Sequence, residues 1–318
     1  MADSVAALRD NKMKIWLAEV RAPFFTATVV PILLGAVIAW ARTGPFHWGY
    51  FLLTMIGGLL LHTGTNVAND YFDHKSGTDD VNVEFVRPFT GGSRMIQEGL
   101  LTPREVISGA LAAYVLAAII GLYLAYVRGP MIIVLGLVGL LSGFFYTAPP
   151  INLVSRGIGE FFIGLNFGVL MTLGAFYVQT GYLDWEPVVA SIPVALLIAG
   201  VLYINEFQDA PADGSVGKDH LVVRFGRRQA AVGYAILMAV TYAWIAGAAL
   251  LRITSPFTLI ALATLPVAIG AVKVARAHYD EYQKLVPANA ATVFIHLLTG
   301  LLLSAAYLLD GAVRSFVS

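Results

Sequence analysis

Nine long apolar stretches, separated by short polar segments, dominate the pattern of hydrophobic and polar positions along the chain. A helix needs about 20 mostly apolar residues to cross a bilayer. The predicted spans are 22–41, 48–68, 105–127, 130–147, 158–179, 187–207, 229–251, 256–276 and 291–312. Strand-like alternation is absent, and open sheets do not span lipid. The pattern therefore predicts an all-α membrane protein with nine transmembrane helices.

Three prolines, Pro31, Pro193 and Pro266, fall inside predicted spans. A proline lacks a backbone N–H and frees the carbonyl one turn before it. We expect each of these helices to kink or a neighbouring group to bind the freed carbonyl.

Composition supports the membrane assignment. The 318 residues are 58% hydrophobic and 13% charged, whereas about a quarter of the residues of a soluble domain are charged. The 31 glycines suit membrane helices that approach closely. The absence of cysteine excludes disulfides, thiolate metal sites and cysteine nucleophiles. A net charge of zero gives no reason to expect nucleic acid as a partner.

The basic residues predict the orientation. With nine spans, the N-terminus and every second loop lie on one side of the membrane. Of the 20 Lys and Arg residues, only Arg42, Arg128, Arg252 and Arg314 fall on the other side, whereas the rest, Arg9 included, fall on the first. Because cytoplasmic loops are enriched in positive residues, we expect a multi-pass protein of the inner membrane with a cytoplasmic N-terminus.

Two acidic motifs end the second and sixth apolar runs on that same side. They read NVANDYFD at Asn66–Asp73 and NEFQDAPAD at Asn205–Asp213. Ionisable groups are rare in membrane helices and mark functional sites when they occur. One such motif could be only a solvated helix end, but two matched motifs favour function.

Helical spacing places the polar residues of each motif on one face, within about 60° for the first and about 80° for the second. The second estimate requires the helix to persist through Pro211. Carboxylate and amide oxygens are the ligands of Mg²⁺, and the lack of a matching His or Cys argues against zinc. The predicted ligands are Asn66, Asp70, Asp73, Asn205, Asp209 and Asp213.

The loop after each motif is basic and rich in glycine. Lys and Arg there could bind phosphate oxygens beside a motif-bound metal. Arg21, before the first span, is a further candidate for an anion contact. The basic candidates in the loops are Lys75, Arg87, Arg94 and Lys218.

Other polar residues have competing interpretations. Tyr146 and Tyr203 could face a cavity or lie in the interfacial aromatic belt, and the belt is the commoner place for Tyr146. Glu160 has no partner at helical spacing, so function and a buried ion pair stay open. Asp79, Asp80 and Glu84 read as surface loop charges, although Asp79 could assist the site, and Arg227 with Arg228 read as positive anchors.

These motifs resemble the UbiA superfamily of intramembrane prenyltransferases over nearly the whole chain. Within it the chain is similar to the branch that prenylates 1,4-dihydroxy-2-naphthoate in menaquinone biosynthesis. The segments that carry this resemblance are NDYFDHKSGTD (Asn69–Asp79), GGSRMIQEGLLTP (Gly91–Pro103), YTAPP followed by RGIGEFF (Tyr146–Phe162), YVQTG (Tyr177–Gly181) and NEFQDAPADGSVGKDHLVVRFG (Asn205–Gly226). The chain departs from that branch at Gln208, where Pro is common, and at Asp219-His220, where Arg-Thr is common.

The resemblance implies a nine-helix bundle around a central cavity under a cytoplasmic cap. It implies one polytopic domain over 1–318, with pseudo-repeat halves of about 1–150 and 151–290 and a ninth helix. The partners would be an isoprenoid diphosphate, an aromatic acceptor and the lipid bilayer. Oligomeric state and isoprenoid chain length are not encoded in any recognisable pattern.

The expected mechanism has four catalytic carboxylates, Asp70, Asp73, Asp209 and Asp213, which together with the two asparagines hold two Mg²⁺ ions. The ions and basic residues neutralise the diphosphate, the allylic C1–O bond ionises, and the electron-rich ring attacks. Faces of Tyr146 and Tyr203 could stabilise the cation.

Alternatives are another acceptor or another class of protein. The acceptor could be 4-hydroxybenzoate, homogentisate, chlorophyllide or a glycerol phosphate ether. A cation-coupled transporter would also have matched halves, but it would carry its charges near the bilayer midplane.

Overall fold

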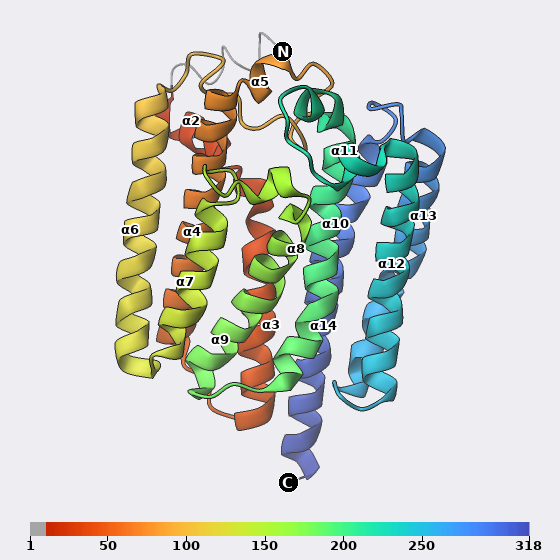
Figure 1. The fold of residues 1–318 in the computed structure, drawn as a ribbon. Helices are drawn as coiled ribbons and strands as arrows, with labels where there is room; N and C mark the ends of the chain where they lie inside the picture. The colour runs from red at the N-terminus through yellow and green to blue at the C-terminus, as the bar shows by residue number, and fades with distance from the viewer. Residues whose placement is uncertain (1–10, 318) are drawn as a thin grey trace.

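The computed structural model describes residues 11–317, and within that range every regular element is a helix. Among these residues, eight helices are long and apolar enough to cross a membrane (Figure 1). They are η1 (Ala22–Phe25) with α3 (Thr26–Thr43), α4 (Trp48–Ser76), α6 (Pro103–Arg128), α8 (Gly159–Gly164) with η3 (Leu165–Leu170) and α9 (Met171–Thr180), α10 (Trp185–Ser215), α12 (Arg227–Leu250), η4 (Pro256–Thr264) with α13 (Leu265–His278), and α14 (Val286–Val317). Each coincides with one predicted span.

The predicted span 130–147 corresponds to α7 (Met131–Phe144), which has only 14 residues. At 1.5 Å per residue this helix is about 21 Å long, which is shorter than the hydrocarbon core. Arg9, counted in the sequence among the basic residues of the first side, lies outside the described residues.

Short elements gather at one end of the bundle. These are α2 (Lys12–Glu19), α5 (Thr78–Val81), η2 (Leu153–Arg156) and α11 (Leu221–Phe225). In Figure 1, α2, α5 and α11 lie at the end where α4 and α10 finish. Both acidic motifs therefore lie at the same end of the molecule, as the sequence predicted.

Helix α10 continues through both of its prolines because α12 binds the carbonyls that they free. Pro193 frees the carbonyl of Val189, which accepts a hydrogen bond from Trp244 Nε1 at 3.0 Å. Pro211 frees the carbonyl of Phe207, which accepts from Arg227 Nε at 2.7 Å. The last turn of the second motif is therefore helical, and Arg227, predicted to be only an anchor, stabilises it.

Small residues allow the bundle to pack closely. A Cβ added at Gly35 of α3 would lie 2.1 Å from the carbonyl oxygen of Thr172 in α9, so the two backbones touch there. Large apolar side chains such as Leu116, Ile119 and Leu122 of α6 point outward and are more than half exposed. An outer face of this kind is suited to lipid.

Candidate functional site

The two acidic motifs line one polar cavity of about 200 Å³, which we call the site cavity. Asn66 and Asp73 reach it from α4, and Asn205, Asp209 and Asp213 reach it from α10. Two helices that are distant in sequence thus bring carboxylates to a common space, as the spacing predicted.

Asp70 lies behind the cavity wall and is 3% exposed. Its carboxylate forms an ion pair with Arg21 and accepts a hydrogen bond from the backbone N–H of Ser93 at 3.1 Å. The hydroxyl of Ser93 donates to Glu19 at 2.5 Å. Arg21 lines the cavity and has a left-handed backbone, φ 55°. Asp70 is therefore held from two sides and positions Arg21.

Lys218 joins the two motifs. Its ammonium lies 3.3 Å from Asp73 Oδ1 and 3.6 Å from Asp213 Oδ1. Burial alone would lower the pKa of Lys218, but the carboxylates of Asp213 and Asp73 outweigh it and keep that pKa well above its usual value. Lys218 is therefore a fixed positive charge at the wall of the site cavity.

The second motif has its own set of partners. Asp209 Oδ1 accepts a hydrogen bond from Asn82 Nδ2 at 2.7 Å, and Asp213 Oδ2 lies 3.2 Å from His220 Nε2. The buried amide of Asn205 accepts from Asn289 Nδ2 of α14 at 2.8 Å. By contrast, Asn66 of the first motif donates its Nδ2 to the carbonyl of Val20 at 3.3 Å, which leaves its Oδ1 available.

Gly92, in the loop after α4, lies directly against these charged groups. Its φ is +69°, and an added Cβ would lie 3.1 Å from Asp70 Oδ1 and 3.4 Å from Asp79 Oδ1. Any side chain would be strained there and would crowd the carboxylates. The glycine-rich character noted in the sequence thus allows the backbone to approach the site.

Several predicted site residues do not line the cavity. Lys75 lies over the ring of Tyr71 at 5.6 Å, and Arg87 pairs with Glu98. Arg94 donates to the carbonyl of Asp79 at 2.8 Å. Tyr203 is buried in the core beside Phe207, with its hydroxyl directed at Gly233 of α12.

The sequence favoured a position for Tyr146 in the interfacial aromatic belt. In the structure Tyr146 instead is 8% exposed and lines the site cavity. The packing of the turn after α7 beneath α8 buries it: a Cβ added at Gly159 would lie 3.2 Å from its ring. This contact depends on tertiary folding and leaves no signal in local sequence.

Sequence reasoning also missed residues at the site. Asp79, interpreted as a surface charge, is 4% exposed, lines the cavity and accepts from Gln97 Nε2 at 3.0 Å. Burial, together with Asp73 and Asp70, raises the pKa of Asp79 to about 7. Burial and Asp70 raise the pKa of Glu19 to about 8. Only the proximity of Asp79 to the first motif hinted at its role.

An apolar cavity of about 250 Å³ adjoins the site cavity. It lies among α4, α6, α7 and α9, and side chains such as Leu61, Ile120, Leu137 and Met171 line it. Both cavities share part of their walls. The shared residues are His62, Thr65, Tyr146, Ile163 and Phe167.

Comparison with known proteins identifies related chains of similar length. The 1,4-dihydroxy-2-naphthoate octaprenyltransferase of Bacillus subtilis is 29% identical over 248 residues, which is 78% of this chain and 78% of that one. The 2-carboxy-1,4-naphthoquinone phytyltransferase of Synechocystis is 27% identical over 296 residues, covering 92% of this chain and 93% of that one.

Solved structures share the fold. A UbiA homolog from Aeropyrum pernix is 17% identical and superposes with a TM-score of 0.62, covering 90% of this chain and 97% of that one. A UbiA homolog from Archaeoglobus fulgidus, bound to GPP and Mg²⁺, is 15% identical with a TM-score of 0.57, covering 91% and 99%.

A family model matches residues 28–298, which include both acidic motifs, Lys218 and most of the helices of the bundle. The apolar helices and this match together identify a multi-pass membrane enzyme. The chain belongs to the UbiA prenyltransferase family.

Proposed function

We propose that this enzyme transfers a polyprenyl group from an isoprenoid diphosphate to 1,4-dihydroxy-2-naphthoate, with Mg²⁺, in menaquinone biosynthesis. The observation that carries the proposal is the junction of a polar and an apolar cavity. Carboxylates of both motifs and Lys218 line the first, and apolar side chains of four helices line the second. A diphosphate with a long hydrocarbon tail has these same two parts.

The donor set fits divalent metal ions. Hard oxygen ligands from two helices face one cavity, and the ammonium of Lys218 already lies between Asp73 and Asp213, where a positive charge is stabilised. We assign Asn66 and Asp73 to one ion and Asp209 and Asp213 to a second, whereas Asp70, which the sequence predicted as a ligand, would act by holding Arg21 from behind the cavity wall. Asn205 contributes less, because its Oδ1 accepts from Asn289. When bound, the ions would neutralise the diphosphate and improve it as a leaving group.

The residues of the chain would position both reactants. Arg21 and Lys218 bind diphosphate oxygens while the C1–O bond breaks and its electron pair leaves with the diphosphate. The ring of Tyr146, in the wall shared by the cavities, faces the allylic cation. The acceptor ring carbon then attacks C1, and loss of a proton or of CO₂ restores aromaticity.

The topology supports a ninth crossing by α7. Tyr146, just after α7, lies in the cavity with Asp73, whereas Arg128, at the other end of α6, binds the carbonyl of Val178 near the far end of α9. A return of the chain across the bundle through α7 would connect these points, which supports the proposal of a ninth crossing (Figure 1). We further propose that the motif end faces the cytoplasm and that α2, α5, α11 and the neighbouring loops form a cap.

The element order suits two pseudo-repeat halves in a single domain. The first half, about 1–150, has α3, α4, α6 and α7, and the second, about 151–290, has α8–α9, α10, α12 and η4–α13, with α14 as the ninth helix. In both halves the acidic motif ends the second spanning helix.

The choice of acceptor rests on the names of the related proteins, and an acceptor panel tests it. Purified enzyme would receive labelled geranylgeranyl diphosphate, Mg²⁺ and either dihydroxynaphthoate, 4-hydroxybenzoate, homogentisate, chlorophyllide or a glycerol phosphate ether. We expect a prenylated product only from dihydroxynaphthoate. A product from another acceptor, with none from dihydroxynaphthoate, would overturn the assignment, and product masses from mixed prenyl diphosphates would define the preferred chain length.

A further inference from the structure

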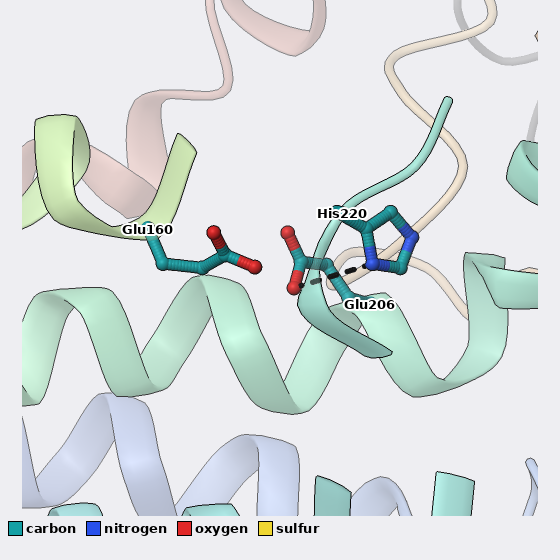
Figure 2. Close-up of side chains that lie close together, drawn as sticks. All are labelled: Glu160, Glu206 and His220. Atoms are coloured by element: carbon teal, nitrogen blue, oxygen red, sulfur yellow. Dashed lines mark ion pairs between the residues drawn. The ribbon is translucent and has the colours of Figure 1, made fainter. Parts of the chain in front are cut away.

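Three buried side chains converge beside the site cavity, and no lysine or arginine of the described residues forms an ion pair with them. Glu160 comes from the start of α8, Glu206 from α10 and His220 from the residue before α11 (Figure 2). They are 6%, 4% and 0% exposed. One oxygen or nitrogen of each lies within 4.8 Å of those of the other two. We call these residues the Glu–Glu–His cluster.

The hydrogen bonds around the cluster leave several acceptors unused. Leu221 N–H donates to Glu160 Oε1 at 2.9 Å. The second oxygen of Glu160 and both oxygens of Glu206 are buried and have no hydrogen-bond partner among the described residues. Figure 2 shows the two carboxylates directed toward each other and Glu206 directed toward His220. Orphaned buried acceptors of this kind are costly unless a proton or a cation lies between them.

His220 is oriented as a metal ligand would be. Its Nε2 lies 3.2 Å from Asp213 Oδ2, and its Nδ1 lies 3.6 Å from Glu206 Oε2. Both ring nitrogens are buried without a hydrogen-bond partner among the described residues, so Nδ1, on the side of the two glutamates, is free to coordinate a cation. The carboxylate of Asp213 lies next to Nε2, as a carboxylate commonly does beside the second nitrogen of a metal-binding histidine.

Charge balance calls for either a shared proton or a cation between the two carboxylates. Among residues 11–317, no lysine or arginine forms an ion pair with Glu160 or Glu206, since the nearby Lys218 pairs with Asp73 and Asp213. A protonated His220 would balance the negative charge of Glu206 through one oxygen, but the negative charge of Glu160 would stay without a positive partner. A divalent ion would compensate both carboxylates and use the free nitrogen.

We propose that Glu160, Glu206 and His220 bind a divalent transition-metal ion, at a site separate from the two magnesium sites. One imidazole with two carboxylates is a ligand set for Zn²⁺, Mn²⁺ or Fe²⁺ rather than for Mg²⁺. Three protein ligands leave coordination positions open. Glu206 also lines the site cavity, so the proposed ion would lie beside the space proposed for the diphosphate.

Cobalt binding tests the site without reference to activity. Full-length protein in detergent would be stripped of metal, supplied with excess Mg²⁺ and titrated with Co²⁺, with visible absorption and bound metal as readouts. We expect one equivalent of Co²⁺ that Mg²⁺ does not displace, with the absorption bands of a nitrogen-containing site. His220→Gln and Glu206→Gln should each weaken this binding at least about 100-fold. A thermal unfolding curve confirms that each variant is folded.

The matched control is His278→Gln, which removes a histidine that is 2.9 Å from a carboxylate but lies at the surface. It should bind Co²⁺ as the unaltered protein does.

Two results would overturn the proposal. The first is that no Co²⁺ binds in the presence of excess Mg²⁺, and the second is that folded His220→Gln and Glu206→Gln bind Co²⁺ as tightly as the unaltered protein. An infrared band of a protonated carboxyl that disappears in Glu206→Gln, in protein that binds no Co²⁺, would assign a shared proton instead. No prenyl diphosphate or acceptor is used, so failure here leaves the proposed function intact.

Discussion

Helices α4 and α10 end in corresponding acidic motifs, yet the structure supports them differently. α4 has no proline and closes on Gly77, whereas α10 carries Pro193 and Pro211 and depends on α12 for the carbonyls that these prolines free. The first motif has an ion pair with Arg21, and the second has amide partners in Asn82 and Asn289. Matched sequence motifs therefore do not imply matched environments.

The main difference lies in where the partners come from. Asn82 follows α4 in the chain but binds Asp209 of α10, and Lys218 follows α10 but binds Asp73 of α4. The loop after each motif thus reaches the opposite motif as well as its own, since Ser93 also donates to Asp70 and Lys218 also pairs with Asp213. The site therefore depends on contacts exchanged between the segments that follow α4 and α10, and neither segment supplies all of them.

The largest expected effect is the loss of a carboxylate. Asp70→Asn and Asp209→Asn keep the side-chain volume and remove one charge each from the two motifs. We expect each to lower the Mg²⁺-dependent turnover by about 100- to 1,000-fold, because preorganised charges at a reacting centre contribute that much. The exposed carboxylate of Asp219 offers a control, and Asp219→Asn should retain turnover close to normal. Normal turnover in either motif variant would contradict the two-motif site.

Lys218→Met tests the exchange itself. Lys218 contacts both motifs, whereas Lys75, in the corresponding position after the first motif, lies over Tyr71 outside the cavity. We expect Lys218→Met to lower kcat/KM for the prenyl diphosphate about 100-fold, as for one lost electrostatic group. Lys75→Met should change it little. Equal losses would mean that each loop serves its own motif.

We expect different roles for the two motif asparagines, Asn66 as a metal ligand and Asn205 as a residue that stabilises the fold. Asn66 Oδ1 is available to a metal, so Asn66→Ala should raise the Mg²⁺ concentration for half-maximal turnover about tenfold, which is near 1.4 kcal/mol. Asn205→Ala should instead lower the free energy of unfolding by about 1–3 kcal/mol, because Asn289 loses a buried partner. Metal titration and thermal unfolding distinguish the two, and the reverse result would exchange their roles.

The smallest expected effect concerns the support of α10. Trp244→Phe removes the donor to the carbonyl freed by Pro193. We expect the free energy of unfolding to fall by about 1 kcal/mol, with turnover little changed. Trp48→Phe, at the start of α4 and 68% exposed, is the control. Equal stability of the two variants would show that α10 does not need this contact.

The sequence was sufficient where a local pattern determines the structure. Length and hydropathy located the eight helices of the described residues that are long enough to span a membrane, and helical spacing placed the polar residues of each motif on one face. The sequence failed where contacts join distant segments. Nothing local predicts that Asn82 reaches Asp209 across 127 positions, or that Gly92 lies against the carboxylate of Asp79. Lys75, Arg87 and Arg94 are basic residues in the loops after the motifs, as Lys218 is, so the sequence could not distinguish their roles. Only the tertiary fold places these three side chains on other partners.

The contact between Lys218 and Asp73 also has a consequence for how the protein is made. The two residues are 145 positions apart, and ribosomes add about 5–20 residues per second. Asp73 is therefore synthesised roughly 7–30 s before its ammonium partner. During that interval the α4 carboxylates depend on water, on Arg21 or on metal ions from solution. Biogenesis of this enzyme should accordingly be sensitive to chain pauses placed between the two motifs.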